Sequence, residues 1–211
     1  MEQVNNFDKI KSLLIFEKGV TYYFIQVIQR KKENPDLPKS EIQRGFWYIT
    51  SIKELEIHWP RIKKICDDYN ARAYISLIPR SLEKLGKKCL VEYSKRIVNN
   101  EYSRIFAIPQ KNALSKETIH TLGTKPWWCI DIDNASYMPK ISEYFLIFTN
   151  IKSILKSPNG YHLIVECFNP KIIKPYLIIK SRDDYRFASG EEFTLRKECN
   201  TILYTGKSKG S

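Results

Sequence analysis

The sequence predicts an α+β sheet domain. Segments rich in β-branched and aromatic residues alternate irregularly with segments in which apolar residues recur at helical spacing. A chain of 211 residues, 43% of them hydrophobic, can bury one core of reasonable size. We therefore expect a single domain over residues 1–211, with neither an internal repeat nor a low-complexity tract.

The first half of the chain predicts strands and two helices. Ser51 can cap a helix that Pro60 interrupts and that resumes through residues 61–70, where apolar residues return at helical spacing. A lysine-rich amphipathic helix follows over about residues 81–98. Strands are expected over residues 19–32, 46–51 and 71–80.

The second half predicts mainly strands that carry polar residues at their ends. Residues 99–125 are weakly patterned, with one short helix expected around residues 115–122. Helices are also expected over residues 141–150 and, broken at Pro175, over residues 171–180. Strands are expected over residues 127–133, 151–156, 161–168, 191–197 and 200–208.

The charge balance favours a polyanionic partner. Thirty-five lysines and arginines stand against 23 acidic residues, a net charge of +12. Such an excess attracts nucleic acid or nucleotides by releasing counterions from phosphates. An AT-rich genome also favours lysine without any binding role, so the charge alone does not establish such a partner. The site residues must decide whether the chain binds nucleic acid or nucleotides.

Other features exclude several classes of protein. No segment approaches the roughly 20 apolar residues that cross a bilayer, so no membrane partner is expected. The amino terminus lacks the apolar region of a secretory signal, and we expect a cytoplasmic protein. The five cysteines form no CxxC pair and are odd in number, which argues for reduced, mostly buried thiols rather than disulfides or a zinc site.

Two aspartates end the strand predicted at residues 127–133. Asp131 and Asp133 share one face of it, and apolar residues occupy the other. Residues two apart in a strand lie roughly 6–7 Å apart, close enough for their carboxylates to hold one or two divalent ions, as phosphoryl transfer requires. The alternative is a strand that ends in solvated acids, because an Asp-x-Asp motif is common.

A turn with a histidine at its exit forms the second candidate. The backbone amides and the hydroxyl of Ser157-Pro158-Asn159-Gly160 can face an anion, and Gly160 allows a phosphate to approach the main chain closely. His162 can donate a hydrogen bond to a phosphate oxygen. The alternative is a simple hairpin turn followed by a histidine.

Together the two motifs resemble motifs I and II of the archaeo-eukaryotic primases. An Asp-x-Asp that closes an apolar strand is followed about 25 residues later by a Ser-x-Asn-Gly-x-His that opens another. Residues 24–32 and 70–81 are also similar to the amino-terminal module of small, phage-type primase-polymerases, so the resemblance covers most of residues 20–206. It implies an RRM-like mixed or antiparallel sheet in a catalytic module over about 99–211, preceded by an αβ module over about 1–98.

The resemblance implies a role for each motif. Asp131 and Asp133 would bind the catalytic Mg²⁺ or Mn²⁺ ions. The incoming triphosphate would lie against the turn motif. The residues implied to bind it are Ser157, Asn159, Gly160 and His162.

The third acid of the family's metal site is missing from its usual position. Alternation puts Glu192, Thr194 and Arg196 on one face of a strand, and Thr194 aligns with the usual acid. A threonine cannot supply the negative charge, so Glu192 is the expected third catalytic and metal-binding residue. Asp183 or Asp184 could replace it from what the sequence predicts to be a loop.

Basic side chains could complete a phosphate-binding surface, although a single one is more often a solvated charge. The basic side chains expected to contact nucleic acid are Arg72, Arg80, Lys156 and Lys207.

Trp127 and Trp128 could stack on bases, but Trp128 shares the apolar face of its strand, which favours core packing.

These observations favour a template-dependent nucleotidyltransferase, a DNA primase or polymerase in which a 3′-hydroxyl attacks the α-phosphate of an incoming nucleotide. Its partners would be a DNA or RNA template-primer and nucleoside triphosphates, with any helicase or other replication protein acting in trans. Small size and family resemblance suggest a phage or mobile-element origin. One alternative is a catalytically inactive primase-fold protein that binds nucleic acid, and another is a metal-dependent nuclease that uses the same aspartates.

Overall fold

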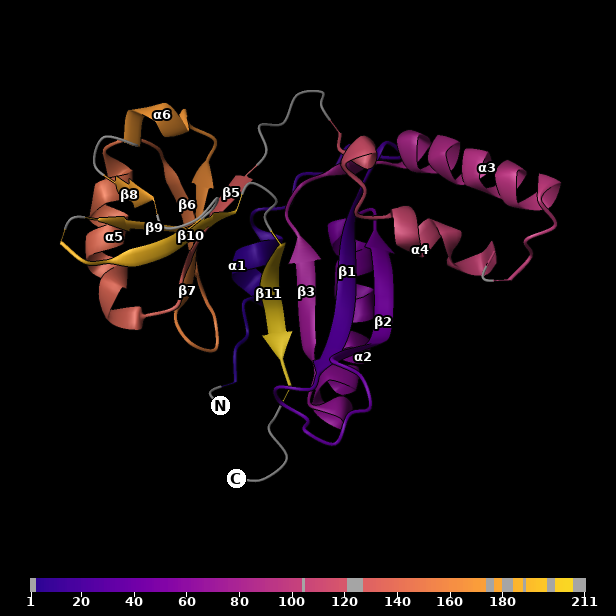
Figure 1. The fold of residues 1–211 in the computed structure, drawn as a ribbon, viewed down its shortest axis with the longest axis horizontal. Coiled ribbons are helices and arrows are strands. Elements are labelled where there is room, and N and C mark those ends of the chain that lie inside the picture. Colours follow the sequence, from indigo (N-terminus) through magenta and orange to yellow (C-terminus); the bar gives the residue numbers. More distant parts are fainter. Residues whose placement is uncertain are drawn as a thin grey trace.

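The computed structural model describes residues 3–103, 105–120, 127–173, 177–179, 184–187, 189–196 and 200–206. Within them the chain forms two antiparallel β-sheets and helices that pack on them (Figure 1), so the expected α+β class is confirmed. None of the helices described there has the length and hydropathy needed to cross a bilayer. The α-helices among these residues are α1 (Phe7–Lys11), α2 (Ile52–Tyr69), α3 (Leu82–Val98), α4 (Ile108–Asn112), α5 (Met138–Leu146) and α6 (Pro170–Ile173), and the 3₁₀ turns are η1 (Ile105–Ala107), η2 (Lys116–Thr118) and η3 (Ala135–Tyr137).

The first sheet comes mainly from the first half of the chain. Its strands are β1 (Thr21–Arg30), β2 (Glu41–Ile49), β3 (Arg72–Ser76), β4 (Arg80–Ser81) and β11 (Asn200–Thr205). They run in the order β11-β3-β1-β2, and β4 pairs with β1. Tyr23 and Ile25 of β1 belong to the core beneath α2, while Tyr22 and Phe24 pack against residues of α3 and α4 on the other side.

The second sheet comes from the second half. Its strands are β5 (Trp127–Ile132), β6 (Ile151–Lys156), β7 (Tyr161–Glu166), β8 (Leu177–Ile179), β9 (Asp184–Phe187) and β10 (Glu192–Arg196). They run in the order β6-β7-β5-β10-β9-β8. Ile130 and Ile132 share a core with Ile141 and Phe145 of α5, so α5 covers that face.

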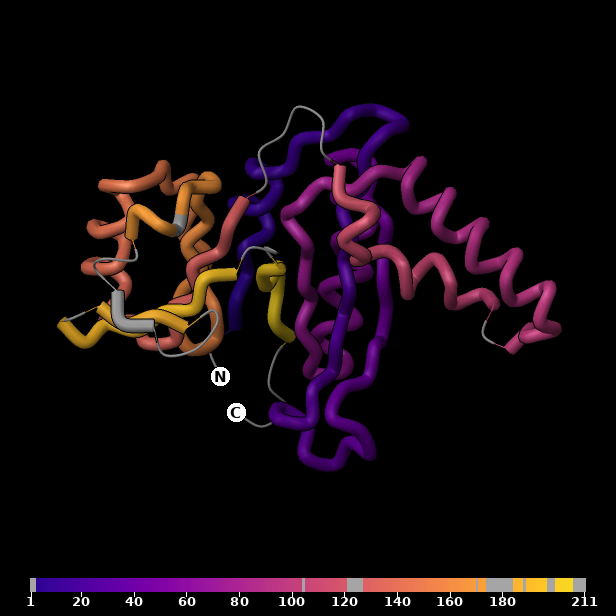
Figure 2. Tube along the Cα trace, turned by 45° about the horizontal axis from the view of Figure 1, so that its top comes forward, coloured from indigo at the N-terminus to yellow at the C-terminus, as the bar shows by residue number. Residues whose placement is uncertain are grey.

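The last strand joins the two sheets. β10 lies in the second sheet, whereas β11 pairs antiparallel with β3 of the first sheet. Yellow segments accordingly appear in both halves of the molecule in Figure 2. Although residues 99–211 were expected to form one module, β11 therefore belongs to the sheet of the amino-terminal residues. Leu155 and Ile164 of the second sheet share one core cluster with Leu203 and Tyr204 of β11.

Strand ends differ from the expectation where pairing outweighs local propensity. The strand expected from residue 46 begins earlier, at Glu41, which lies opposite Arg30. It begins earlier because β1 is long enough to pair with these additional residues. The strand expected over residues 71–80 ends at Ser76, and Arg80 begins the separate β4.

Two expected helices are shorter than predicted. Residues 177–179 form β8, paired with β9, where a helix had been expected; Pro175 lies outside the described residues. Sheet pairing of an apolar Leu-Ile-Ile run explains the difference. The helix expected around residues 115–122 is reduced to η2, and α1 and α4 were not predicted.

The described cysteines are free thiols, as expected. Cys66, Cys89 and Cys129 are buried and Cys167 is partly buried. Burial, with the neighbouring Asp67, raises the pKa of the Cys66 thiol to about 12. Cys199 lies outside the described residues.

The helix expected to break at Pro60 is continuous, so that prediction was wrong. Ser51 caps α2, as expected, by accepting a hydrogen bond from the backbone N–H of Glu54 at 3.1 Å. Pro60 is exposed, and so is Glu56, whose carbonyl would have received the missing N–H. Water can solvate that carbonyl, and burial of the opposite face of α2 holds the helix together.

Replacing Pro60 with alanine should therefore stabilise the protein. Pro60→Ala restores an N–H in an exposed helix interior, and we expect the free energy of unfolding to rise by about 1–3 kcal/mol. Urea unfolding followed by circular dichroism measures this, with Lys53→Ala in the same helix as the control that changes little. A lower midpoint for Pro60→Ala would show that the proline ring itself stabilises α2.

Candidate acidic active site

β5 presents the two motif aspartates as the alternation predicted. Asp131 lies opposite His162 of β7 on one side and opposite Thr194 of β10 on the other. Asp131 is only 8% exposed. Asp133 follows the end of β5 and is exposed.

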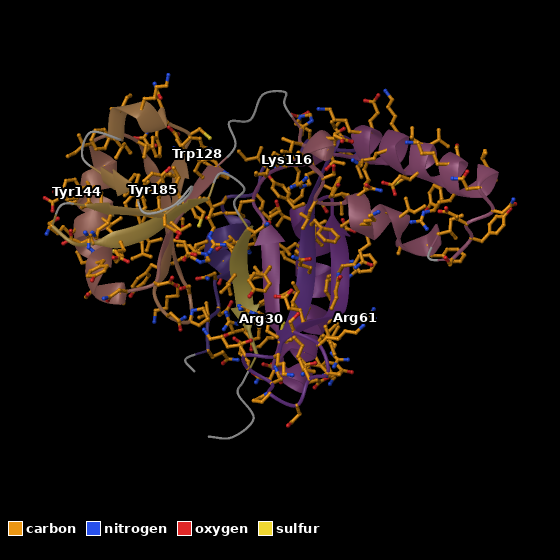
Figure 3. All side chains as sticks on the ribbon, in the orientation of Figure 1. Arg30, Arg61, Lys116, Trp128, Tyr144 and Tyr185 are labelled. Atoms are coloured by element: carbon orange, nitrogen blue, oxygen red, sulfur yellow. The ribbon has the colours of Figure 1, made fainter. Side chains whose placement is uncertain are left out.

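A pocket of about 500 Å³ opens beside these aspartates. We call it the acidic pocket, because four carboxylates line it. Tyr185, which Figure 3 labels, also contributes to its lining. The lining residues are Asp131, Asp133, Asn134, Tyr137, Asp184, Tyr185, Glu192, Phe193 and Thr194.

Strand pairing brings the third and fourth carboxylates to the pocket. Glu192 begins β10, and it lies on the same face of that strand as Thr194. Thr194 lies opposite Asp184 of β9, and its hydroxyl donates a hydrogen bond to Asp184 Oδ1 at 2.7 Å. The acid missing at Thr194 is thus matched by one on the next strand.

The sequence offers Asp184 only as an alternative to Glu192 for the third acid, because Asp184 was expected to lie in a loop. The structure instead makes it the first residue of β9. The alternation of Asp184 and Arg186 with Tyr185 and Phe187 is the local signal that could have indicated a strand. Asp183 lies outside the described residues.

A histidine and an arginine compensate the buried Asp131 carboxylate. His162 Nε2 lies 3.3 Å from Asp131 Oδ1, and the guanidinium of Arg196 lies 2.5 Å from Oδ2. Burial by itself would raise the pKa of Asp131, but His162 and Arg196 outweigh it, so the pKa is lowered. Asp131 is therefore ionised at neutral pH.

His162 connects this carboxylate to the first sheet. Its Nδ1 lies 2.7 Å from Thr201 Oγ1 of β11, and the residue is only 7% exposed. Burial would lower the pKa of His162, but the hydrogen bond to Asp131 outweighs that effect and the pKa is raised above its ordinary value. Both ring nitrogens have partners within the protein, so the ring as placed orients Asp131 and has no nitrogen left for a phosphate.

The turn after β6 is held tightly against the end of β5. The Ser157 N–H donates to the Gly160 carbonyl at 2.9 Å, and the Gly160 N–H donates to Ser157 Oγ at 3.1 Å. A Cβ on Gly160 would lie 1.9 Å from the carbonyl oxygen of Ile132. The absence of a side chain at Gly160 lets the turn lie directly against the backbone beside Asp133. Asn159, in the same turn, is exposed.

The basic residues chosen from the sequence lie in different surroundings. Arg72 is 8% exposed and pairs with Glu33 at 2.6 Å, and Arg80 is 1% exposed and donates to the carbonyl of Ser115. Both guanidinium groups are held inside the fold, so the expectation that they contact nucleic acid is corrected. Lys156 is exposed at the end of β6, and Lys207 lies outside the described residues.

The carboxylates of the acidic pocket line it without converging. Among the described residues, no three His, Cys, Asp or Glu side chains form a group that could hold a metal ion as they stand. The donor chemistry nevertheless suits a hard cation, because the four side chains offer only oxygen atoms.

Comparison with known proteins adds no relative: no protein-family model, curated protein or solved structure matches this chain.

Gly160→Ala should test the contact between the turn and β5. Because the added methyl group would overlap the carbonyl oxygen of Ile132, the backbone must shift, and we expect a loss of about 1–3 kcal/mol in the free energy of unfolding. Gly86→Ala is the matched control: nothing lies within 4 Å of its Cβ, so in α3 it should stabilise by about 0.5–1 kcal/mol. Equal midpoints in urea for both variants would contradict the packing described here.

The raised pKa of His162 predicts a pH-dependent contribution to stability. A folded-state pKa above the ordinary value of 6.5 means that the stabilisation is complete below about pH 6.5 and is lost as the pH rises through the folded value. The stability difference between wild type and His162→Gln should therefore be larger near pH 6 than near pH 9, a range in which Asp131 stays ionised. Urea unfolding at both pH values measures it, and His58→Gln serves as the partly exposed control. A difference that does not change with pH would contradict the assignment.

Proposed function

We propose that this chain is a divalent-metal-dependent nucleotidyltransferase of the primase-polymerase type, which extends a nucleic-acid strand along a template. The observation that carries the proposal is the acidic pocket itself. A chain with a net charge of +12 gathers Asp131, Asp133, Asp184 and Glu192 around one pocket. Four carboxylates repel phosphates unless bound cations lie between them, so the arrangement suits a site where metal ions and phosphates meet.

The pocket residues fit Mg²⁺ or Mn²⁺ by their chemistry. Asp131 and Asp133 would hold the ions, with Asp184 or Glu192 as the third acid. When bound, such ions neutralise the charge that develops on the phosphates and lower the pKa of an attacking hydroxyl. The bond from the 3′-oxygen to the α-phosphorus would form as the bond to pyrophosphate breaks, and the hydroxyl proton would pass to solvent.

The surrounding side chains have separate tasks in this proposal. His162, held by Thr201, fixes the orientation of Asp131 and keeps it ionised. Arg196 is 52% exposed beside Asp131, so its guanidinium can turn from that carboxylate to a phosphate when a cation takes its place. Gly160 keeps the backbone at the end of β5 in position.

The inactive, nucleic-acid-binding relative is a second candidate, and one observation favours it. Arg196 already pairs with one carboxylate oxygen of Asp131 and His162 contacts the other, so both oxygens have partners without a metal ion. If these contacts are permanent, Asp131 holds the fold together and takes no part in chemistry. The two candidates differ in whether Mn²⁺ binds and whether a primer is extended.

Primer extension tests the proposal. With a labelled primer-template, nucleotides and Mg²⁺ or Mn²⁺, Asp133→Asn should lower extension at least about 100-fold, because this exposed acid can be neutralised without disturbing the core. Asp184→Asn and Glu192→Gln are compared in the same assay. The third acid is the one whose substitution lowers primer extension about as much as Asp133→Asn does. Glu143→Gln, an exposed acid on α5, is the matched control and should retain activity.

A measurement of Mn²⁺ binding by isothermal titration calorimetry accompanies the assay. Weaker Mn²⁺ binding by Asp133→Asn than by Glu143→Gln supports the site. Full extension by Asp133→Asn would remove that residue from it. Absence of both Mn²⁺ binding and extension in a wild-type protein that still binds nucleic acid would establish the inactive relative.

A further inference from the structure

The first sheet has one face that helices cover only in part. α3 and α4 pack against Tyr22 and Phe24 at one end of that face. Beyond them, β1 continues on the same side with the partly exposed Gln26, Ile28 and Arg30. Figure 1 shows α2 behind β1 and β3, on the opposite side of the sheet.

Two aromatic rings flank a glutamine on this face. Gln26 of β1 lies opposite Phe46 of β2 and opposite Tyr74 of β3. Residues directly opposite each other in antiparallel strands point to the same side, so these three side chains form one row across the sheet. Strand spacing separates the two rings by roughly 10 Å.

The row is accessible to solvent. Phe46 is 41% exposed, and Gln26 and Tyr74 are partly exposed. Gln110 of α4 donates a hydrogen bond to the side chain of Gln43, so α4 lies along the β2 side of the face. We call the surface formed by Gln26, Phe46 and Tyr74 the aromatic face.

Positive charge borders the aromatic face. Arg30, labelled in Figure 3, ends β1, and its guanidinium lies 3.4 Å from the hydroxyl of Tyr74. The exposed Lys31 and Lys32 follow it directly. Glu41 lies 3.9 Å from Arg30, so part of this charge is balanced while the two lysines add to it.

We propose that the aromatic face binds single-stranded nucleic acid. Bases would stack on Phe46 and Tyr74, the amide of Gln26 between the rings can hydrogen-bond a base edge, and Arg30, Lys31 and Lys32 meet the phosphates. Exposed rings on a sheet beside positive charge bind unpaired bases, because each base offers a flat surface that a duplex hides. The basic border favours this polyanion over an apolar protein segment as the occupant.

This surface is separate from the acidic pocket. It lies on strands β1, β2 and β3 of the first sheet, whereas the pocket is lined by residues of the second sheet and the turn after β5. The inference therefore does not rest on the proposed nucleotidyl transfer. It adds a site at which an unpaired strand is held.

Fluorescence anisotropy with a labelled oligothymidylate tests the proposal. Phe46→Ala should weaken binding roughly 5- to 100-fold, the effect of losing one stacked base, and Phe46→Tyr should bind as the wild type does. Phe106→Ala is the matched control, because Phe106 is 94% exposed but lies on η1, outside the aromatic face. Phe46→Trp adds a second readout, a tryptophan emission that base stacking quenches.

Several outcomes would overturn the inference: no binding by the wild-type protein, unchanged affinity in Phe46→Ala, an equal loss in Phe106→Ala, or tighter binding of a duplex than of the single strand. Circular dichroism spectra of each variant verify that the fold is intact. Glu143→Gln, on α5 and outside both surfaces, should bind the oligonucleotide like the wild type. Failure of primer extension together with binding that depends on Phe46 would reject the proposed function and leave the aromatic face standing.

Discussion

The compensation of a buried carboxylate determines much of this structure. Asp131 is ionised yet only 8% exposed, and an uncompensated charge in such a place would strongly destabilise the fold. His162 of β7 and Arg196 of β10 supply the compensation from the two neighbouring strands. Because His162 also contacts Thr201, the same network connects the second sheet to the first through β11.

Backbone packing supports the same region. Gly160 permits the turn after β6 to lie against the carbonyl of Ile132, where a side chain would collide. The turn thus helps to fix the position of β5, the strand that carries Asp131. Its glycine and its histidine both act on β5, one through the main chain and one through the carboxylate of Asp131. A motif that resembles a phosphate-binding turn can therefore also position the neighbouring aspartate strand.

The distribution of charge separates two surfaces with opposite character. The acidic pocket collects carboxylates from β5, β9 and β10 and the turn that follows β5, and it suits cations. The aromatic face lies on the first sheet beside Arg30, Lys31 and Lys32, and it suits a polyanion with exposed bases. Arg72 and Arg80 contribute to neither surface, because their guanidinium groups are buried within the fold.

The sequence by itself determined the features that depend on neighbouring residues. The α+β class, the strand that carries Asp131, the hairpin closed by Ser157 and Gly160, and the cap at Ser51 all follow from local periodicity and turn chemistry. These patterns are local because they repeat over two to four residues. They also located Asp131 and Asp133 on one face of their strand.

Only the tertiary structure decided what depends on partners distant in the chain. The burial of Arg72 and Arg80, the approach of Asp184 to Thr194, and the pairing of β11 with β3 all require strand neighbours that no local pattern specifies. Helix α2 passes through Pro60 because packing of its buried face outweighs one missing hydrogen bond. Long-range pairing and burial set these outcomes, since each is a balance of free energies among segments that meet only in the folded chain.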